Sequence, residues 1–255
     1  MISINGESLP VTIFPDNTSQ VWKLPPHLLS SPVTEVFWEY THEGEFMQIA
    51  QLKALLDQTN TFTVLSIKYL PYARQDKAVD NELTFALQVF AKQLNSLEFN
   101  NVIILDPHSN EALELIDNSE AVFPMDEISK VIIDEKIGLV CYPDAGALRK
   151  YAELYDYPYI HGEKVREQST GYITHYELKG DPKGKNVLIV DDICDGGMTF
   201  KILAKALLAS GANSVVLFVT HGIFSKGTRT LFDSGIAKVY TADGEVGKRS
   251  GSIQF

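Results

Sequence analysis

Cysteine is scarce in this sequence, and long apolar runs are missing from it. Only two cysteines, Cys141 and Cys194, occur among 255 residues, too few for the disulfide framework of a small secreted domain. No stretch reaches the roughly 20 apolar residues that a membrane helix needs, and the amino terminus has no signal-peptide pattern. We therefore expect a soluble cytoplasmic protein whose thiols are reduced.

Positive charge is also in short supply. Lysine and arginine number 22 against 33 aspartates and glutamates, which gives a net charge of −11. The mean field of such a chain repels nucleic acid and anionic membranes, so neither is an expected partner. Hydrophobic residues make up 45%, enough for one large or two small domains with a core. Small molecules are the expected partners, and local lysines and arginines must bind any phosphate.

No low-complexity linker interrupts the chain, and strand and helix patterns alternate along it. This alternation predicts an α/β fold in which mainly parallel sheets are flanked by helices. The expected strands are 11–14, 36–39, 62–68, 102–105, 121–123, 137–141, 158–160, 187–190, 215–219 and 237–240. The expected helices are 45–58, 82–98, 109–117, 126–135, 145–154, 199–210 and 225–233.

Residues 187–199 are the most informative segment. A four-residue apolar run predicts a strand buried on both faces, and two adjacent carboxylates follow it. The turn into the next helix can present backbone N–H groups to an anion at the positive end of the helix dipole. We therefore predict a site for a phosphorylated ribose, although carboxylates in this position also serve as helix caps. The candidate residues are Asp191, Asp192, Asp195, Gly196, Gly197, Met198 and Thr199.

Other polar residues follow predicted strands. Arg74 offers a forked donor for phosphate oxygens, and Gln75 can read a base or sugar edge; the alternative is a surface loop. His108 and Asp144 follow the strands expected at 102–105 and 137–141, where a packed histidine and a helix cap are the alternatives. Two cations, Lys164 and Arg166, stand beside glutamates and could equally form a solvated charge cluster.

Taken together, these segments resemble the ribose-phosphate pyrophosphokinase (PRPP synthetase) family, and in particular its short phage-type members. Four residues match the family's Asp-Asp-x-x-Asp-Thr-Gly-Gly-Thr motif, namely Asp191, Asp192, Asp195 and Thr199. Phosphoribosyltransferases share that motif. They lack the ATP-binding string Pro-Tyr-Ala-Arg-Gln-Asp, which occurs here at residues 71–76. Residues 106–109 and 142–146 resemble two further family segments in the same order.

The resemblance implies two similar domains, which we expect at 1–124 on the ATP side and 125–255 on the ribose-phosphate side. It implies transfer of the pyrophosphoryl group of ATP to the 1-hydroxyl of ribose 5-phosphate, with Mg²⁺ accompanying ATP. The implied roles are ATP binding by Arg74, Gln75, Asp76, Phe14 and Asp16, metal binding by His108 and Asp144, and catalysis by Lys164 and Arg166. Residues 167–182 would form a mobile flap, and a homo-oligomer is expected because the family builds its adenine site across subunits.

The chain departs from the family at the phosphate loop, where Gly196, Gly197 and Met198 replace Thr-Gly-Gly. One hydroxyl donor is lost, and an adaptable apolar side chain is gained. A phosphate diester needs fewer donors than a monoester, so ADP-ribose is an alternative acceptor, with a role in NAD salvage. A phosphoribosyltransferase and a catalytically silent nucleotide-binding regulator remain the alternatives from other classes.

Overall fold

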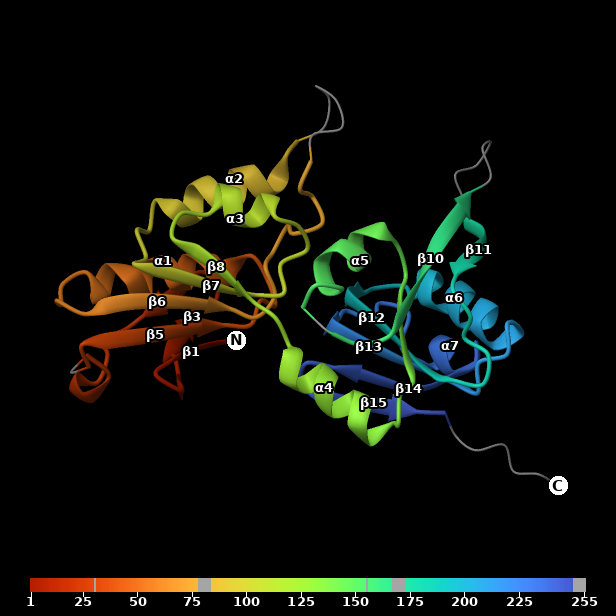
Figure 1. The fold of residues 1–255 in the computed structure, drawn as a ribbon. Coiled ribbons are helices and arrows are strands. Elements are labelled where there is room, and N and C mark those ends of the chain that lie inside the picture. Colours follow the sequence, from red (N-terminus) through yellow and green to blue (C-terminus); the bar gives the residue numbers. More distant parts are fainter. Residues whose placement is uncertain (30, 78–83, 155, 167–172, 250–255) are drawn as a thin grey trace. The chain divides into compact units, whose positions relative to one another are not determined.

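The computed structural model describes residues 1–29, 31–77, 84–154, 156–166 and 173–249, with the side chains of 165, 166, 173 and 174 left out. The chain divides into two compact units, Met1–Phe123 and Pro124–Phe255 (Figure 1). Both are α/β units with mainly parallel sheets, which confirms the predicted fold class. In the described ranges no helix is both long and apolar enough to cross a membrane.

Unit 1 is built on one sheet with the strand order β2-β1-β5-β6-β7-β8 in its described part. The last four strands run parallel: β5 (Val33–Trp38), β6 (Phe62–Ile67), β7 (Asn101–Leu105) and β8 (Ser119–Val122). The edge strands β1 (Ile2–Ile4) and β2 (Glu7–Ser8) are antiparallel additions. Their shortness explains why the apolar pattern did not predict them.

The helices of unit 1 cover the sheet with apolar faces. They are α1 (Gly44–Leu56), α2 (Ala86–Asn95) and α3 (Glu111–Leu115), with a 3₁₀ turn at Pro26–Leu29. Figure 1 shows α2 and α3 side by side against the sheet. Leu87, Phe90 and Leu94 of α2 join Trp38 and Leu65 of the strands in the core.

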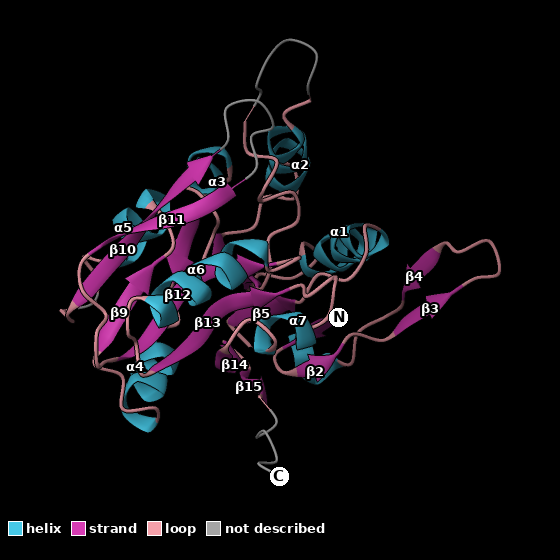
Figure 2. Cartoon of the chain, turned by 90° about the vertical axis from the view of Figure 1, so that its right-hand side faces the viewer, coloured by secondary structure: helices cyan, strands magenta, loops and turns pink. Residues whose placement is uncertain are grey.

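A hairpin formed by β3 (Val11–Ile13) and β4 (Ser19–Val21) extends from unit 1 as a separate ribbon (Figure 2). The side chain of Gln51 in α1 accepts from Val21 N at 2.8 Å and donates to Ser19 O at 2.9 Å. The hairpin is therefore attached to the unit through α1.

Unit 2 contains a sheet with the strand order β11-β10-β9-β12-β13-β14-β15 among its described residues. Its parallel strands are β9 (Leu139–Tyr142), β10 (Tyr159–Arg166), β12 (Asn186–Cys194), β13 (Ser214–Gly222) and β14 (Ile236–Thr241). The edge strands β11 (Ile173–Lys179) and β15 (Gly244–Lys248) pair antiparallel to their neighbours.

The helices of unit 2 are α4 (Met125–Asp134), α5 (Ala145–Tyr151), α6 (Met198–Ala209) and α7 (Arg229–Phe232). α6 buries Leu203 and Leu207 against the sheet. It ends one residue before the expected 210, and Gly211 just beyond it takes a left-handed φ of 92°. Gly211 N donates to Leu208 O and Ala212 N to Leu207 O, the Schellman pattern that satisfies terminal carbonyls.

Three predicted elements of unit 2 differ from the structure. β12 extends beyond the predicted 187–190 to Cys194, because it remains paired with β13 as far as that residue. β10 is longer than 158–160 because it pairs with β11, so residues 173–179 of the expected flap are a strand; residues 167–172 lie outside the described part. The helix expected at 225–233 shrinks to α7, since the left-handed Gly227 (φ 67°) closes a turn before it.

One buried acid, Glu45 of α1, ties together the start of unit 1. Its carboxylate accepts from Trp38 Nε1 at 3.0 Å, from Thr41 N at 2.8 Å and from the amino terminus at 2.6 Å. Burial alone would raise the pKa of Glu45, but these donors outweigh it and lower the pKa from 4.5 to about 2. The ionised form therefore stabilises the folded state.

The substitution Glu45→Gln tests this contribution. Because the folded-state pKa is depressed, the stabilisation is present above pH 4.5 and is lost as the pH falls toward 2. We expect the variant to lower the free energy of unfolding by about 2–3 kcal/mol near neutral pH. Denaturant unfolding across pH should show the difference vanishing in acid. The exposed Glu114→Gln is the control, and a difference independent of pH would contradict the assignment.

A second test concerns the glycine before α6. Gly197 has φ 72°, and a Cβ there would lie 2.7 Å from Leu231 Cδ2, whereas Gly184 has φ 71° with nothing within 4 Å. Both alanine variants share the left-handed strain of roughly 1–2 kcal/mol. We expect Gly197→Ala to lose about 1–2 kcal/mol more, since the clash must be relieved in a packed core. Equal losses in denaturant unfolding would show that Leu231 yields without cost.

Candidate functional site

Asp191 and Asp192 lie where β12 continues beyond its neighbour. β9 pairs with β12 only as far as Ile189, while β13 pairs with it through Cys194. The two aspartates are therefore strand residues with one open side, not residues of the loop that follows. The open side faces the segment after β9, which contains Asp144.

The carboxylates of this segment repel one another. Burial, then the negative charges of Asp192 and Asp144, raise the pKa of Asp191 well above its usual range. Asp192 is compensated by Lys150 of α5, whose Nζ lies 3.2 Å from Asp192 Oδ2. The ionised form of Asp191 would therefore be stabilised by hydroxyl donors or by a cation.

Asp144 has two tasks at the start of α5. Its Oδ1 accepts from Gly146 N at 2.9 Å and Ala147 N at 3.0 Å. This is the helix-capping role that the sequence analysis gave as the alternative for Asp144. Its Oδ2 accepts from Lys164 Nζ at 2.6 Å. Burial opposes ionisation, but Lys164 and the two amides lower the pKa of Asp144.

Lys164 belongs to β10 and stands directly opposite Tyr176 of β11. Cross-strand partners project from the same face of a sheet, so Lys164 and Tyr176 share one face. Tyr176 is 6% exposed. Burial, and further the charges of Asp144 and Asp191, raise the pKa of Tyr176, whereas an interaction with the Thr199 hydroxyl lowers it. Tyr176 therefore stands in the carboxylate cluster as a neutral phenol.

The turn from β12 into α6 is formed by Asp195, Gly196 and Gly197. No side chain caps the amino end of α6, so its first N–H groups are available to an anion. Met198 is 56% exposed. A Cβ at Gly196 would meet Lys226 Cδ only at 3.7 Å, which is ordinary contact. The loop therefore has free space at Gly196, the position where the family motif has threonine.

Two segments of unit 1 follow neighbouring parallel strands. Arg74, Gln75 and Asp76 follow β6, and the exposed His108 follows β7. The carboxyl ends of parallel strands share one edge of a sheet, so these segments lie at the same edge. Backbone bonds hold the first segment, as Gln75 N donates to Tyr72 O and Leu87 N donates to Gln75 O. Arg74 and Gln75 are exposed.

Phe14 and Asp16 belong to the loop of the β3–β4 hairpin instead. The Thr18 hydroxyl and amide donate to Asp16 Oδ1 at 2.7 and 3.1 Å, which lowers the pKa of Asp16. Phe14 is 40% exposed. The loop is locally fixed, and Thr18 stands where the family has glutamate.

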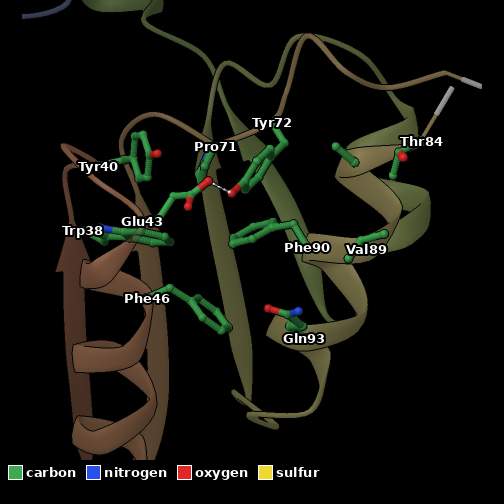
Figure 3. A pocket seen from close by; sticks show the side chains of 11 residues that line it. Trp38, Tyr40, Glu43, Phe46, Pro71, Tyr72, Thr84, Val89, Phe90 and Gln93 are labelled. Carbon is green, nitrogen blue, oxygen red and sulfur yellow. Dashed lines mark hydrogen bonds between the residues drawn. The ribbon is translucent and has the colours of Figure 1, made fainter. Parts of the chain in front are cut away.

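A pocket of about 280 Å³ opens beside the first segment of unit 1 (Figure 3). Aromatic rings dominate its walls, and the Tyr72 hydroxyl donates to Glu43 Oε1 at 2.5 Å. Such a pocket accepts a flat apolar group and repels phosphate. The sequence pattern does not reveal this pocket, because its walls come from β5, α1, α2 and the turn after β6, which are far apart along the chain. Its lining includes Trp38, Tyr40, Phe46, Pro71, Val89 and Phe90.

The structure thus brings Asp144, Lys164, Asp191, Asp192 and Thr199 into one cluster of unit 2. The side chain of Arg166 lies outside the described residues. The sequence did not single out Lys150 or Tyr176, because only tertiary contacts bring them to Asp192 and to Thr199. Both thiols are free and buried. Burial raises the pKa of each to about 12, so neither is a nucleophile at neutral pH.

A magnesium site of protein side chains alone does not fit the described residues. They contain no cluster of three or more potential ligands, and both oxygens of Asp144 already accept hydrogen bonds. A magnesium ion bound chiefly through nucleotide phosphates would need few protein ligands.

This chain is similar to several known proteins. Residues 159–247 match the family described as Phosphoribosyl transferase domain. The ribose-phosphate pyrophosphokinase of Pyrococcus furiosus is 32% identical over 195 residues, which cover 74% of this chain and 69% of that protein. The enzyme of the same name from Sulfurisphaera tokodaii is 27% identical over 91% of this chain and 82% of its own. The structure of phosphoribosylpyrophosphate synthetase from Mycobacterium smegmatis superposes with a TM-score of 0.64 at 22% identity, covering 77% of this chain and 66% of that one.

The charge cluster makes a prediction about stability. Asp191→Asn keeps the shape of the side chain and removes the repulsion from Asp192 and Asp144. We expect the ligand-free variant to melt about 2–4 °C higher at neutral pH, which corresponds to about 1 kcal/mol in a chain of this size. Thermal unfolding of Asp191→Asn should be compared with the exposed Asp156→Asn. A lower melting temperature of Asp191→Asn would contradict the prediction, because it would show that the ionised Asp191 stabilises the folded protein.

Proposed function

Because the chain belongs to the ribose-phosphate pyrophosphokinase family, we propose that it transfers the β,γ-diphosphoryl group of ATP to the 1-hydroxyl of ribose 5-phosphate. A bond forms between O1 of the sugar and the β-phosphorus, and the bond from that phosphorus to the α–β bridging oxygen breaks. AMP leaves with the bridging oxygen, O1 loses its proton, and the product is a 1-pyrophosphorylated ribose. The observation that carries the proposal is the cluster in unit 2, where carboxylates, a lysine and an uncapped helix end meet.

Asp191 and Asp192 bind the sugar in this proposal. Carboxylates accept hydrogen bonds from vicinal hydroxyls, and these bonds favour the ionised form. The 2- and 3-hydroxyls of ribose therefore relieve part of the unfavourable charge on Asp191. Holding both hydroxyls orients O1 toward the β-phosphorus, which is the entropic part of catalysis.

The turn Asp195–Thr199 receives the 5-phosphate. The first N–H groups of α6 are not capped by a side chain, so they can donate to an anion. The positive end of the helix dipole favours negative charge at the same place. Gly197 adopts a left-handed φ of 72° there, which lets the backbone turn sharply into the helix. Thr199 adds a hydroxyl donor on the first turn.

Lys164 provides positive charge near the reacting groups. Its ammonium is bound to Asp144 at 2.6 Å, so a carboxylate holds it in place. Charge that develops on the transferred group and on AMP is stabilised by such a cation. Arg166 shares this role in the proposal. We assign no general base.

ATP belongs to unit 1 in this proposal. Arg74 binds phosphate oxygens bidentately, and Gln75 and Asp76 bind the polar edge of the nucleoside. The ring-lined pocket beside Tyr72 offers flat apolar surface for a base. The family leads us to expect three further features. These are contacts from Phe14 and Asp16 to a neighbouring copy of the chain, Mg²⁺ binding by His108, and a homo-oligomer.

The acceptor is tested by product analysis. The protein is incubated with Mg-ATP and either ribose 5-phosphate or ADP-ribose, and AMP is quantified. We expect AMP with ribose 5-phosphate. AMP formed only with ADP-ribose would move the proposal to that acceptor, for which the open loop at Gly196 is the supporting feature. ATP-independent transfer of a base to PRPP would identify a phosphoribosyltransferase, and no turnover with any acceptor would favour a regulator.

Lys164→Ala tests the catalytic assignment. We expect turnover to fall by about 10²-fold or more, the usual loss when one charged donor is removed from a transition state. ATP binding, measured by calorimetry, should be largely retained. The control is Lys179→Ala, an exposed lysine of β11 paired with Glu163 and Glu177. Normal turnover by Lys164→Ala would remove Lys164 from the mechanism.

A further inference from the structure

Among the described residues of unit 2, one buried polar side-chain atom lacks a hydrogen-bond partner. The Tyr176 hydroxyl is inaccessible to solvent and forms no hydrogen bond of normal geometry with any described residue. Leaving a buried hydroxyl unpaired costs free energy that phenylalanine would avoid. A tyrosine in this position therefore indicates a state of the protein in which the hydroxyl is satisfied.

The surroundings of Tyr176 identify where that partner is. Its ring is accommodated by Gly162 of β10, since a Cβ there would lie 2.7 Å from Tyr176 Cδ1. Its hydroxyl lies beside the Thr199 hydroxyl, on the first turn of α6. Both lie at the helix end to which the proposed function assigns the acceptor's phosphate.

The direction of the hydrogen bond follows from protonation. Burial and the nearby carboxylates raise the pKa of Tyr176, so the phenol stays protonated and can donate. A threonine hydroxyl has one hydrogen and two acceptor lone pairs. If Thr199 accepts from Tyr176, its own hydrogen is directed elsewhere, and an incoming phosphate oxygen is the strongest acceptor at that helix end.

We propose that Tyr176 is a positioning residue that orients the Thr199 hydroxyl toward the phosphate of the acceptor. This inference rests on the proposed function for the identity of the acceptor. It accounts for a departure of this chain from its family, because the hydroxyl missing at Gly196 leaves Thr199 as the remaining threonine of the loop. A phosphate monoester is the favoured ligand, since its oxygens need the additional donor.

The test is calorimetric titration with ribose 5-phosphate, and with unphosphorylated ribose as the matched ligand. We expect Tyr176→Phe to weaken ribose 5-phosphate binding about fivefold to tenfold and to leave ribose binding unchanged. The same variant should raise KM for ribose 5-phosphate and leave kcat within about twofold. Equal weakening toward both ligands, or unchanged binding of ribose 5-phosphate, overturns the inference.

Two further variants separate positioning from packing. Tyr157→Phe removes another phenol of unit 2, one that donates to Ile137 O at 2.6 Å. It should lower the unfolding temperature and leave ribose 5-phosphate binding intact, whereas Tyr176→Phe should be at least as stable as the parent. In the Thr199→Val background Tyr176→Phe should have no further effect on binding, because the two hydroxyls act in series.

Restoration of the loop hydroxyl completes the test. A Cβ at Gly196 would meet nothing closer than Lys226 Cδ at 3.7 Å, and Gly196→Thr should recover part of the binding lost in Tyr176→Phe. Binding is measured without ATP, so the inference stands or falls separately from the proposed reaction. Weakened binding in Tyr176→Phe with no AMP formation would support the phosphate contact and contradict the pyrophosphoryl transfer.

Discussion

The negative charge that β12 carries beyond the end of β9 is the constraint on which the unit 2 site depends. A strand buried on both faces should end in apolar residues or a turn, yet this one continues with two aspartates held by pairing to β13. The strand pairing fixes their backbone in a buried place. Burial first, and then the negative charges of Asp192 and Asp144, raise the pKa of Asp191.

The two lysines of the cluster moderate this charge in different ways. Lys150 pairs with Asp192, and both side chains are largely buried, at 16% and 8% exposure. Lys164 pairs with Asp144, where the lysine is 21% and the carboxylate 37% exposed. The first pair is therefore structural, since breaking a buried pair is costly. The second is accessible, and a ligand with its own negative charge can compete for Lys164.

The units offer complementary chemistry. Unit 2 concentrates carboxylates and a helix end, which suits a phosphorylated sugar. Unit 1 presents exposed polar residues at one sheet edge, together with a ring-lined pocket whose only described carboxylate, Glu43, is already bonded to Tyr72. Flat apolar groups suit this pocket better than phosphates do. The proposed transfer of a diphosphoryl group from a nucleotide to a sugar phosphate requires a surface of each kind.

The sequence by itself determined the α/β class, the parallel strands and the place where α6 ends, because apolar periodicity and glycines are local signals. Strand-end carboxylates are also a local signal, and they gave the segments predicted to carry the chemistry. It did not reveal the extension of β12, the β10–β11 pair, the pocket, Lys150 or Tyr176. These depend on strand register and on contacts between residues far apart in the chain, such as Lys150 and Asp192, which are 42 positions apart. Tertiary structure alone decided them, since cross-strand facing and burial arise only once the sheet has assembled.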